Sequence, residues 1–148
     1  RMSRLADPLE RRVAELRIAL EPHDTCVVVA LGGELDVVCS QRFDDSLAEA
    51  SARSDRVILD LSGVDFMDTT ALAVIVGHWR RQVAAGGMLL LAGARYRYTK
   101  ALWITGLADR LPMYADVGEA LTAARPEPGA GAGSGGARDS GEPEATVR

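Results

Sequence analysis

Residues 56–77 read R-V-I-L-D-L-S-G-V-D-F-M-D-T-T-A-L-A-V-I-V-G, and this stretch decides the fold. Its first six residues are mostly apolar, which is typical of a central strand covered on one or both faces. Ser62-Gly63 is expected to turn the chain. After Asp68, apolar residues recur at intervals that place them on one face of a helix: Leu72, Ile75, Val76, Trp79 and Val83.

Two strand patterns and a helix pattern precede this unit. Residues 15–20 largely alternate polar and apolar side chains, and residues 26–31 form an apolar, β-branched run. Turn residues lie between them, so the pair predicts a β-hairpin. Gly32-Gly33 is expected to end the second strand, and Ser40 to cap a helix over about 41–52.

Four further elements are expected after the central unit. Gly86-Gly87 should end its helix, because glycine readily adopts the conformation that closes a helix. The pattern then predicts a buried strand over 88–91, a helix over about 96–105 that ends at Gly106, a short strand over 111–114 and a last helix over 117–124.

The element order is therefore β-β-α-β-α-β-α-β-α. Alternating strands and helices imply right-handed crossovers and a largely parallel sheet, with the opening hairpin adding one antiparallel strand. The predicted fold is α/β, with a mixed, mostly parallel five-stranded sheet and about four helices. We expect one domain over residues 13–124, an N-terminal extension over 1–12, and a disordered Gly-, Ala- and Pro-rich tail over 125–148.

Composition excludes several classes of function. The formal net charge is -4, so the chain lacks the basic footprint of a nucleic-acid-binding protein. Apolar runs are too short for a membrane span, and the start lacks the apolar core of a signal peptide, so a cytoplasmic location is expected. The two cysteines, Cys26 and Cys39, have no metal-ligand spacing and are interpreted as reduced core residues.

No catalytic or cofactor-binding constellation is visible. His23 and His78 lie in separate elements and are interpreted as structural or solvent-facing. Ser40 and Ser62 have no adjacent general base, so the parts of a serine hydrolase are missing. Neither glycine pair belongs to a phosphate-binding loop. We therefore expect no metal, no cofactor and no enzymatic activity.

Three stretches carry a family likeness. G-E-L-D at 33–36 follows the second strand, V-I-L-D-L at 57–61 leads into V-D-F-M-D-T-T-A-L at 64–72, and I-T-G-L at 104–107 closes the third helix. Together with the element order, these stretches resemble the STAS domain of bacterial anti-sigma-factor antagonists. The resemblance covers about residues 13–124.

The resemblance implies a function by partner switching. Antagonists of this family bind an anti-sigma factor that is also a serine/threonine kinase, and thereby free the sigma factor. The kinase phosphorylates the antagonist, which then dissociates, and a phosphatase resets it. The acceptor of the family maps onto Thr70, with Thr69 as the second choice, and the acidic residues beside it map onto Asp36 and Asp68.

The chain departs from the family pattern at two positions. Ala71 replaces the glycine usual after the acceptor; in a helix, alanine is favoured over glycine by about 1 kcal/mol. Trp103 replaces a usually polar residue, between Leu102 and Ile104, which are both expected to be buried. Trp103 is either a displaced core aromatic or an exposed partner anchor, and we favour the anchor.

The Asp68-Thr69-Thr70 sequence has two interpretations. As an N-cap, Asp68 accepts a hydrogen bond from the first helical turn and faces the positive end of the helix dipole. As a switch, the hydroxyls receive a phosphate at a helix N-terminus, which favours an anion. The tripeptide alone favours capping, because such signals are common. The motifs and the element order together favour the switch.

A second face of the same helix is a candidate partner surface. Thr70, Ala73, Val74, Gly77 and Arg81 share a stripe that is small and apolar near its start and basic at its end. Such a stripe either contacts a partner or packs on a neighbouring helix. We favour partner contact, because the opposite face already supplies core residues.

Two weaker alternatives complete the sequence-based predictions. The chain could be a STAS scaffold or ligand-sensing module of a signalling assembly or transport complex, in which Thr70 acts only in capping. Residues 95–98, R-Y-R-Y, mix cations and aromatics that suit nucleic acid, but four such residues in an acidic protein favour a solvated face.

Overall fold

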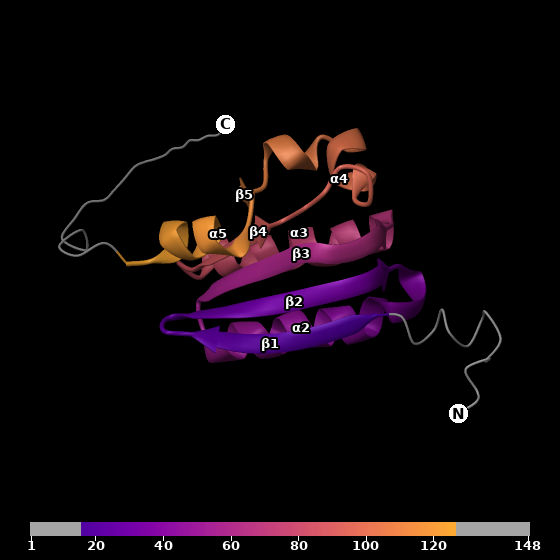
Figure 1. The fold of residues 1–148 in the computed structure, drawn as a ribbon. Helices are drawn as coiled ribbons and strands as arrows, with labels where there is room; N and C mark the ends of the chain where they lie inside the picture. The colour runs from indigo at the N-terminus through magenta and orange to yellow at the C-terminus, as the bar shows by residue number, and fades with distance from the viewer. Residues whose placement is uncertain (1–15, 127–148) are drawn as a thin grey trace, which may run out of the picture.

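The computed structural model describes residues 16–126 (Figure 1). The first twelve residues, expected to form an extension, lie outside this range. So do residues 127–148, which make up nearly all of the expected tail. The domain boundaries near residues 13 and 125 therefore remain predictions.

A five-stranded mixed sheet forms the centre of the molecule. Strand β1 (Arg17–His23) pairs antiparallel with β2 (Cys26–Leu35), as the hairpin pattern predicted. Strands β3 (Arg56–Met67), β4 (Met88–Ala92) and β5 (Met113–Tyr114) continue the sheet in parallel, in the spatial order β1-β2-β3-β4-β5.

Within residues 16–126, four α-helices connect or follow these strands. They are α2 (Ser40–Arg53), α3 (Thr69–Ala84), α4 (Lys100–Ile104) and α5 (Val117–Ala124). Two 3-10 turns, η2 (Val37–Cys39) and η3 (Leu107–Asp109), precede α2 and follow α4. The predicted fold class and element order are confirmed.

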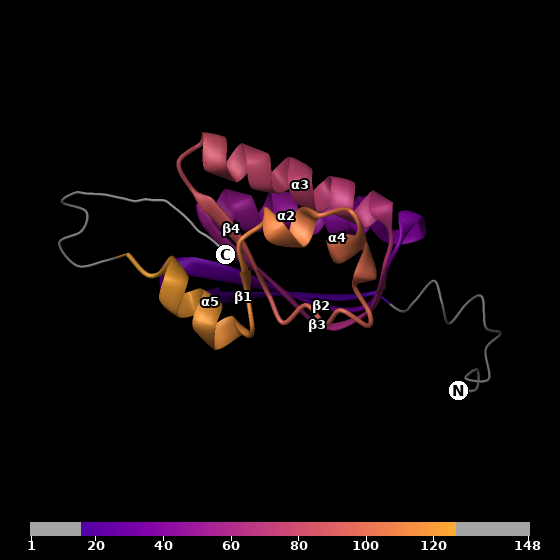
Figure 2. The same cartoon turned by 90° about the horizontal axis from the view of Figure 1, so that it is seen from above.

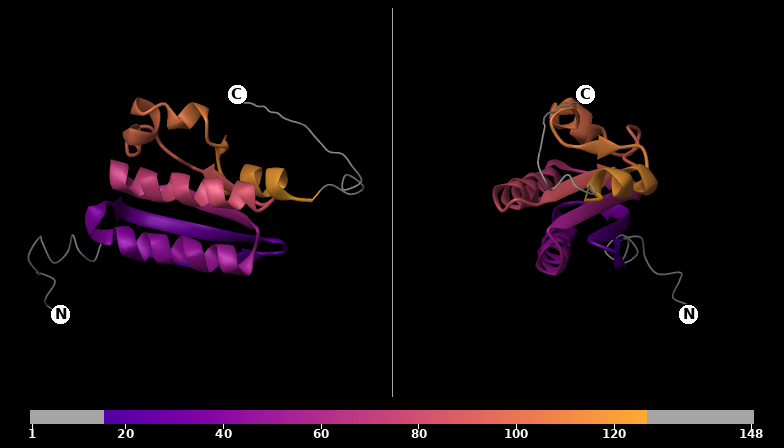
Figure 3. Two further views of the ribbon diagram at one scale, coloured as in Figure 1. Left: turned by 180° about the vertical axis from the view of Figure 1, so that it is seen from behind. Right: turned by 90° about the vertical axis from the view of Figure 1, so that its left-hand side faces the viewer.

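The helices cover the two faces of the sheet unequally. Helices α2 and α3 lie side by side on one face, and α5 lies on the other (Figures 2 and 3). The larger core lies under α2 and α3, and Phe43, Leu47, Leu59, Ile75 and Leu102 are fully buried in it. A smaller core beneath α5 includes Val28, Ile58 and Leu90. Cys26 and Cys39 are both buried and free, as expected.

Gly32-Gly33, expected to end the second strand, and Ser62-Gly63, expected to turn the chain, both lie inside strands instead. Strand β2 runs through Gly32-Gly33, and β3 runs through Ser62-Gly63. The pairing between the two strands shifts register at this level. A Cβ on Gly63 would lie 2.9 Å from the carbonyl oxygen of Leu31, so the glycine permits close backbone approach at an irregularity of the ladder.

The start of α2 also differs from the prediction. Ser40 is the first helical residue, and its hydroxyl donates to the Val37 carbonyl 3.1 Å away. Cys39 occupies the N-cap position without a side-chain cap bond. The cap of this region lies earlier, because Asp36 caps the η2 turn from which α2 continues.

Helix α4 is shorter than predicted. Residues 96–98 form a turn, and the helix begins only at Lys100. Gly106, with φ of 81°, follows its last turn as expected. Two expected buried positions behave differently here: Leu102 is fully buried, whereas Ile104 is 75% exposed, so the prediction for Ile104 was wrong. A single helical turn offers only one side to the core.

Helix α3 buries a face rotated from the predicted one. Leu72 and Ile75 are buried as expected, but Val83 is exposed, and His78 and Gln82 take inward positions. The Gln82 amide donates to the carbonyls of Asp55 and Met88, at 3.1 and 3.2 Å. These bonds explain why polar side chains occupy the buried face.

Candidate partner-binding and modification site

Asp68 joins the start of α3 to the loop after β2. One carboxylate oxygen, Oδ1, accepts from the Ala71 amide at 3.1 Å, which is the predicted N-cap bond. The other, Oδ2, accepts from the Val37 amide at 3.1 Å. The Asp68 amide in turn donates to the Leu35 carbonyl at 3.1 Å. Three hydrogen bonds therefore hold this junction, and two of them reach across to the neighbouring strand end.

Asp36 is brought to the same place. Strands β2 and β3 run parallel and end together, with Leu35 paired to Met67. Each strand is followed at once by an acidic cap: Asp68 caps α3, and Asp36 caps η2 by accepting from the Val38 amide at 3.1 Å. The two predicted acids thus lie at the carboxyl ends of adjacent strands, where α/β sheets commonly place functional sites.

Both candidate hydroxyls lie at the start of α3. Thr69 is exposed and Thr70 is half-buried, and they are the first two helical residues. Amide groups of a first helical turn lack partners within the helix and attract anions. A phosphate on either hydroxyl would therefore lie in a favourable field of the helix, beside two carboxylates that oppose it.

The predicted stripe on α3 lies at the surface. Ala73 and Arg81 are exposed, while Thr70, Val74 and Gly77 are half-buried. Val74 also packs against the larger core, so it contributes to both surface and interior. A Cβ built on Gly77 would meet only the Arg81 guanidinium, 3.7 Å away. The middle of the stripe is thus open.

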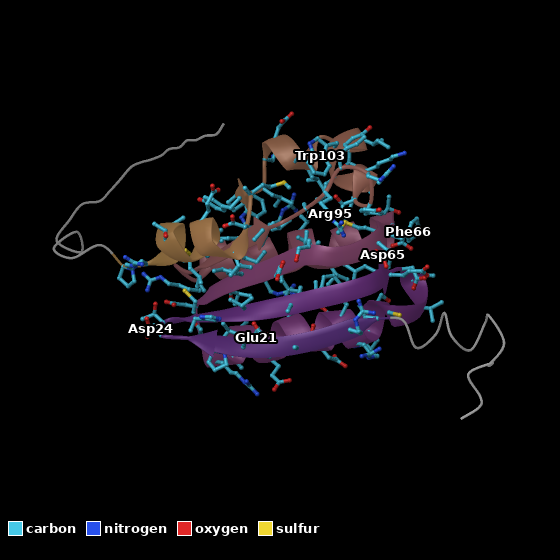
Figure 4. All side chains as sticks on the ribbon, in the orientation of Figure 1. Glu21, Asp24, Asp65, Phe66, Arg95 and Trp103 are labelled. Atoms are coloured by element: carbon cyan, nitrogen blue, oxygen red, sulfur yellow. The ribbon has the colours of Figure 1, made fainter. Side chains whose placement is uncertain are left out.

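Sequence reasoning missed three exposed apolar residues beside the acids. Val37 and Val38 of η2 are 64% and 66% exposed, and Phe66, two residues before Asp68, is 48% exposed. Phe66 lies with exposed Asp65 at the end of β3 (Figure 4). We call Val37, Val38 and Phe66 the strand-end patch. Two adjacent valines in a turn directly after a cap were the available signal.

Burial and local charge affect Cys39 in the same loop. The pKa of its thiol is raised above the ordinary value, first by burial and then by the negative charge of Asp36. The thiol is therefore held protonated, which agrees with the prediction of an inert core cysteine.

The histidines take separate roles. His78 is buried, and its Nε2 lies 2.6 Å from Oδ1 of Asp44, which links α3 to α2. His23 is exposed at the end of β1. Within residues 16–126, no three His, Cys, Asp or Glu side chains come together in a way that could hold a metal ion. Nor does this part of the chain contain a helix long and apolar enough to cross a membrane.

The family model for the STAS domain matches residues 17–120. This range is most of the chain and covers the site from Asp36 to Arg81. The chain therefore belongs to the STAS domain family.

Curated relatives of the chain are named as sigma-factor regulators. The anti-sigma F factor antagonist of Paenibacillus polymyxa is 30% identical over 109 residues, which cover 72% of this chain and 93% of that protein. The anti-sigma-B factor antagonist of Bacillus subtilis is 26% identical over 100 residues, which cover 68% of this chain and 92% of the relative.

Solved structures share the fold. An anti-sigma factor antagonist from Mycobacterium paratuberculosis matches with a TM-score of 0.66 at 23% identity, over 75% of this chain and 95% of that one. The Bacillus cell fate determinant SpoIIAA in its phosphorylated form matches with a TM-score of 0.58 at 24% identity, over 74% of this chain and all of that one.

Proposed function

We propose that the chain is an anti-sigma-factor antagonist that acts by binding. Its relatives carry that name, and its strand-end patch and acidic caps offer a surface suited to a protein partner. The carrying observation is the junction at Asp68, whose carboxylate binds the Val37 amide of η2 and the Ala71 amide of the first turn of α3 and so fixes these two elements relative to each other. The surface is therefore preorganised, which lowers the entropic cost of docking.

The proposed partner is an anti-sigma factor that is also a serine/threonine kinase. The antagonist occupies it with Asp36, Asp68, Thr69, Thr70 and the α3 stripe of Ala73, Val74, Gly77 and Arg81, and the sigma factor is released. This action requires no catalysis by the antagonist, no cofactor, no contact with nucleic acid and no membrane, and it places the chain in the cytoplasm.

Phosphorylation of Thr70 is the proposed off-switch, with Thr69 as the second choice. A phosphate adds about -1.5 to -2 charges beside Asp36 and Asp68. The helix N-terminus tolerates this charge, so the fold persists, but a closely docked partner meets bulk, repulsion and a desolvation cost. A loss of about 3 kcal/mol weakens binding by about a hundredfold. A serine/threonine phosphatase would restore the active form.

The test is a phosphorylation assay with ATP and the anti-sigma-type kinases of the source organism. Intact mass and peptide mapping are expected to show one phosphate on Thr70, absent from Thr70→Ala and retained in Thr69→Ala. Size-exclusion chromatography then compares complex formation before and after the reaction. Phosphate on Thr69 alone would move the switch by one residue, and a phosphorylated chain that still binds the kinase equally well would refute switching.

A non-switching scaffold or ligand-sensing module remains the second candidate. One observation favours it: both oxygens of Asp68 are engaged in structural hydrogen bonds, so capping alone accounts for the acid at this position. Under this alternative, a stable complex forms with a partner, and no kinase of the organism modifies either threonine.

A further inference from the structure

A second exposed surface lies around α4, outside the proposed docking site. Ile104 extends into solvent, Trp103 is 37% exposed, and Tyr96 is exposed on the turn before the helix. The rings of Tyr96 and Trp103 meet edge to face, with centroids 5.4 Å apart. Figure 4 shows Trp103 and Arg95 on the same part of the molecule. We call Arg95, Tyr96, Arg97, Lys100, Trp103 and Ile104 the α4 patch.

The patch is rich in cations whose charges are available. Arg95, Arg97 and Lys100 are all exposed. Among the described residues, ion pairs within 4.0 Å are found only at Arg53–Glu49 and His78–Asp44, so no carboxylate of this range neutralises these three. The Arg95 and Arg97 guanidinium groups lie 4.5 and 5.8 Å from the centroid of the Tyr98 ring.

The backbone beneath the patch is held firmly. Thr99 is fully buried, and its hydroxyl donates to the Arg95 carbonyl at 2.8 Å. Leu102, one residue before Trp103, is fully buried in the larger core. At the end of α4, the Thr105 hydroxyl donates to the Ala101 carbonyl at 2.7 Å. The aromatic and aliphatic side chains are thus presented on a fixed turn, which lowers the cost of binding.

We propose that the α4 patch binds an acidic segment of a protein partner, with a large apolar side chain of that segment packing on Trp103 and Ile104. These three cations, which form no ion pair within residues 16–126, supply charge complementarity to carboxylates. Exposed Trp, Tyr and Arg are the residues that most often dominate binding energy in protein interfaces. The proposal does not rest on the proposed function, because it involves neither threonine nor the acidic caps.

A protein segment fits this surface better than nucleic acid does. A nucleic acid would bring a dense line of phosphates, and α4 lies beside the start of α3 (Figures 1 and 3), which follows two acidic residues, Asp65 at the end of β3 and Asp68 at the N-cap. Ile104, the most exposed apolar side chain of the patch, offers no ring on which a base can stack. A short acidic peptide can contact Arg95, Arg97 and Lys100 without extending to Asp65 and Asp68.

The test uses the full, unphosphorylated chain and two synthetic peptides. One peptide is rich in Glu and Leu, and in the other Lys replaces every Glu. Two-dimensional NMR follows the Trp103 indole and the Ile104 methyl groups during titration. The Glu peptide is expected to shift these signals and the Lys peptide to leave them unchanged. Added salt should weaken the interaction, because exposed charges are screened.

Variants locate the binding to the patch. The combined substitutions Arg95→Glu, Arg97→Glu and Lys100→Glu should lower the affinity for the Glu peptide by about tenfold. Ile104→Asp should lower it by about fivefold. Ile104 and the three cations are exposed, so these changes leave the core intact. Arg125→Glu, which reverses an exposed cation after α5, is the matched control and should bind like the unaltered chain.

Three results would overturn the proposal. The first is binding of the Lys peptide as tightly as the Glu peptide, or a Glu peptide that shifts only the NMR signals of elements outside the α4 patch. The second is an oligo(dT) strand that binds the patch more tightly than the peptide. The third is a dimer in analytical ultracentrifugation that Ile104→Asp dissociates, since the occupant would then be a second copy of the chain. No kinase is involved, so failure here leaves the proposed function untouched.

Discussion

At the scale of single residues, Asp68 combines two structural roles that are usually separate. One oxygen caps α3, and the other holds the Val37 amide of the preceding loop. The side chain is only half-buried, yet it connects two crossovers that are far apart in sequence. The strand-end patch and the threonines therefore keep a fixed relation that depends on one carboxylate.

Replacing Asp68 with alanine is expected to lower the free energy of unfolding by about 2 kcal/mol. The cap contributes about 1 kcal/mol and the loop bond about another. Asp68→Asn keeps one oxygen acceptor and should cost less. Urea unfolding followed by circular dichroism measures both. Asp65→Ala removes an exposed acid nearby and is the control; an equal loss in that variant would show that the bonds of Asp68 contribute nothing specific.

The Cys39 thiol should react slowly and only at high pH. Its folded pKa is raised by burial and by Asp36, so alkylation, which needs the thiolate, should have its midpoint above the ordinary thiol range. The raised pKa of the Cys39 thiol also affects stability. It stabilises the fold at pH values below the ordinary thiol pKa, and this contribution is lost as the pH rises through the pKa of the folded state. Asp36→Asn should lower the midpoint.

The measurement is the iodoacetamide rate across pH in a Cys26→Ala background. Asp65→Asn provides the control, because it also removes a negative charge from the strand ends. A midpoint that does not move in Asp36→Asn would show that Asp36 does not act on the thiol. A faster rate at unchanged midpoint would instead indicate a loosened loop.

At the scale of elements, a polar pair with one buried partner links α2 and α3. His78 of α3 is buried among core residues and bonds Asp44 of α2 at 2.6 Å. Asp44→Ala leaves the buried His78 without its partner and should cost about 1–3 kcal/mol, whereas His78→Ala leaves an Asp44 carboxylate that water can reach, so the lost hydrogen bond itself should cost only about 1 kcal/mol. A double-mutant cycle should give a coupling of about 1 kcal/mol. Strictly additive losses would mean that the pair does not interact.

Element order could be predicted from the sequence, whereas the details of contact could not. The strands, the hairpin and the Asp68 cap follow from local patterns. His78 and Gln82 were not part of the predicted apolar face, because their partners come from residues distant along the chain. A pair of glycines can mark either the end of a strand or an irregularity within it. The end of β2 was therefore wrongly predicted at Gly32-Gly33, through which the strand continues. One-turn α4 carries too few residues for a periodic signal.

The candidate site was predictable in part for the same reason. Asp36, Asp68 and the threonines belong to recognisable motifs at strand ends, and the parallel pairing of β2 with β3 brings them together. The exposure of Val37, Val38 and Ile104 depends on how short turns pack on the core, and the adjacent valines after Asp36 give only a weak local signal of it. The exposure of these three side chains therefore came from the structure, whereas an exposed Trp103 was already favoured from the sequence.

Gly77→Ala separates stability from docking on the α3 stripe. Alanine in the middle of a helix is favoured over glycine by about 0.5–1 kcal/mol, and the new methyl meets only the flexible Arg81 side chain. The variant should therefore unfold at higher urea concentration. If the stripe contacts the anti-sigma partner closely, the same methyl weakens that complex. Increased stability with unchanged affinity would remove Gly77 from the interface.

At the scale of the whole molecule, the proposed switch needs no change of fold. The proposed acceptor hydroxyl lies at a helix N-terminus, and the strand-end patch, the stripe and the α4 patch are all presented by elements packed on one core. The affinity for the partner would then be controlled by the charge at the surface. This arrangement suits a small domain, because the stability of the fold and the affinity for the partner can vary independently.

Phosphorylation should consequently change binding far more than stability. The chain phosphorylated at Thr70 is expected to melt within a few degrees of the unmodified one, since the helix N-terminus stabilises the anion about as much as Asp36 and Asp68 oppose it. Its affinity for the anti-sigma kinase should fall by at least about a hundredfold. Calorimetric titration measures the affinity and thermal unfolding measures the melting temperature of the same two samples. The phosphorylated Thr70→Ser variant is the control, because it carries the same phosphate on a different hydroxyl side chain. A large drop in melting temperature that accompanies the loss of binding would show that the phosphate acts by unfolding the start of α3, and the surface-charge mechanism would be wrong.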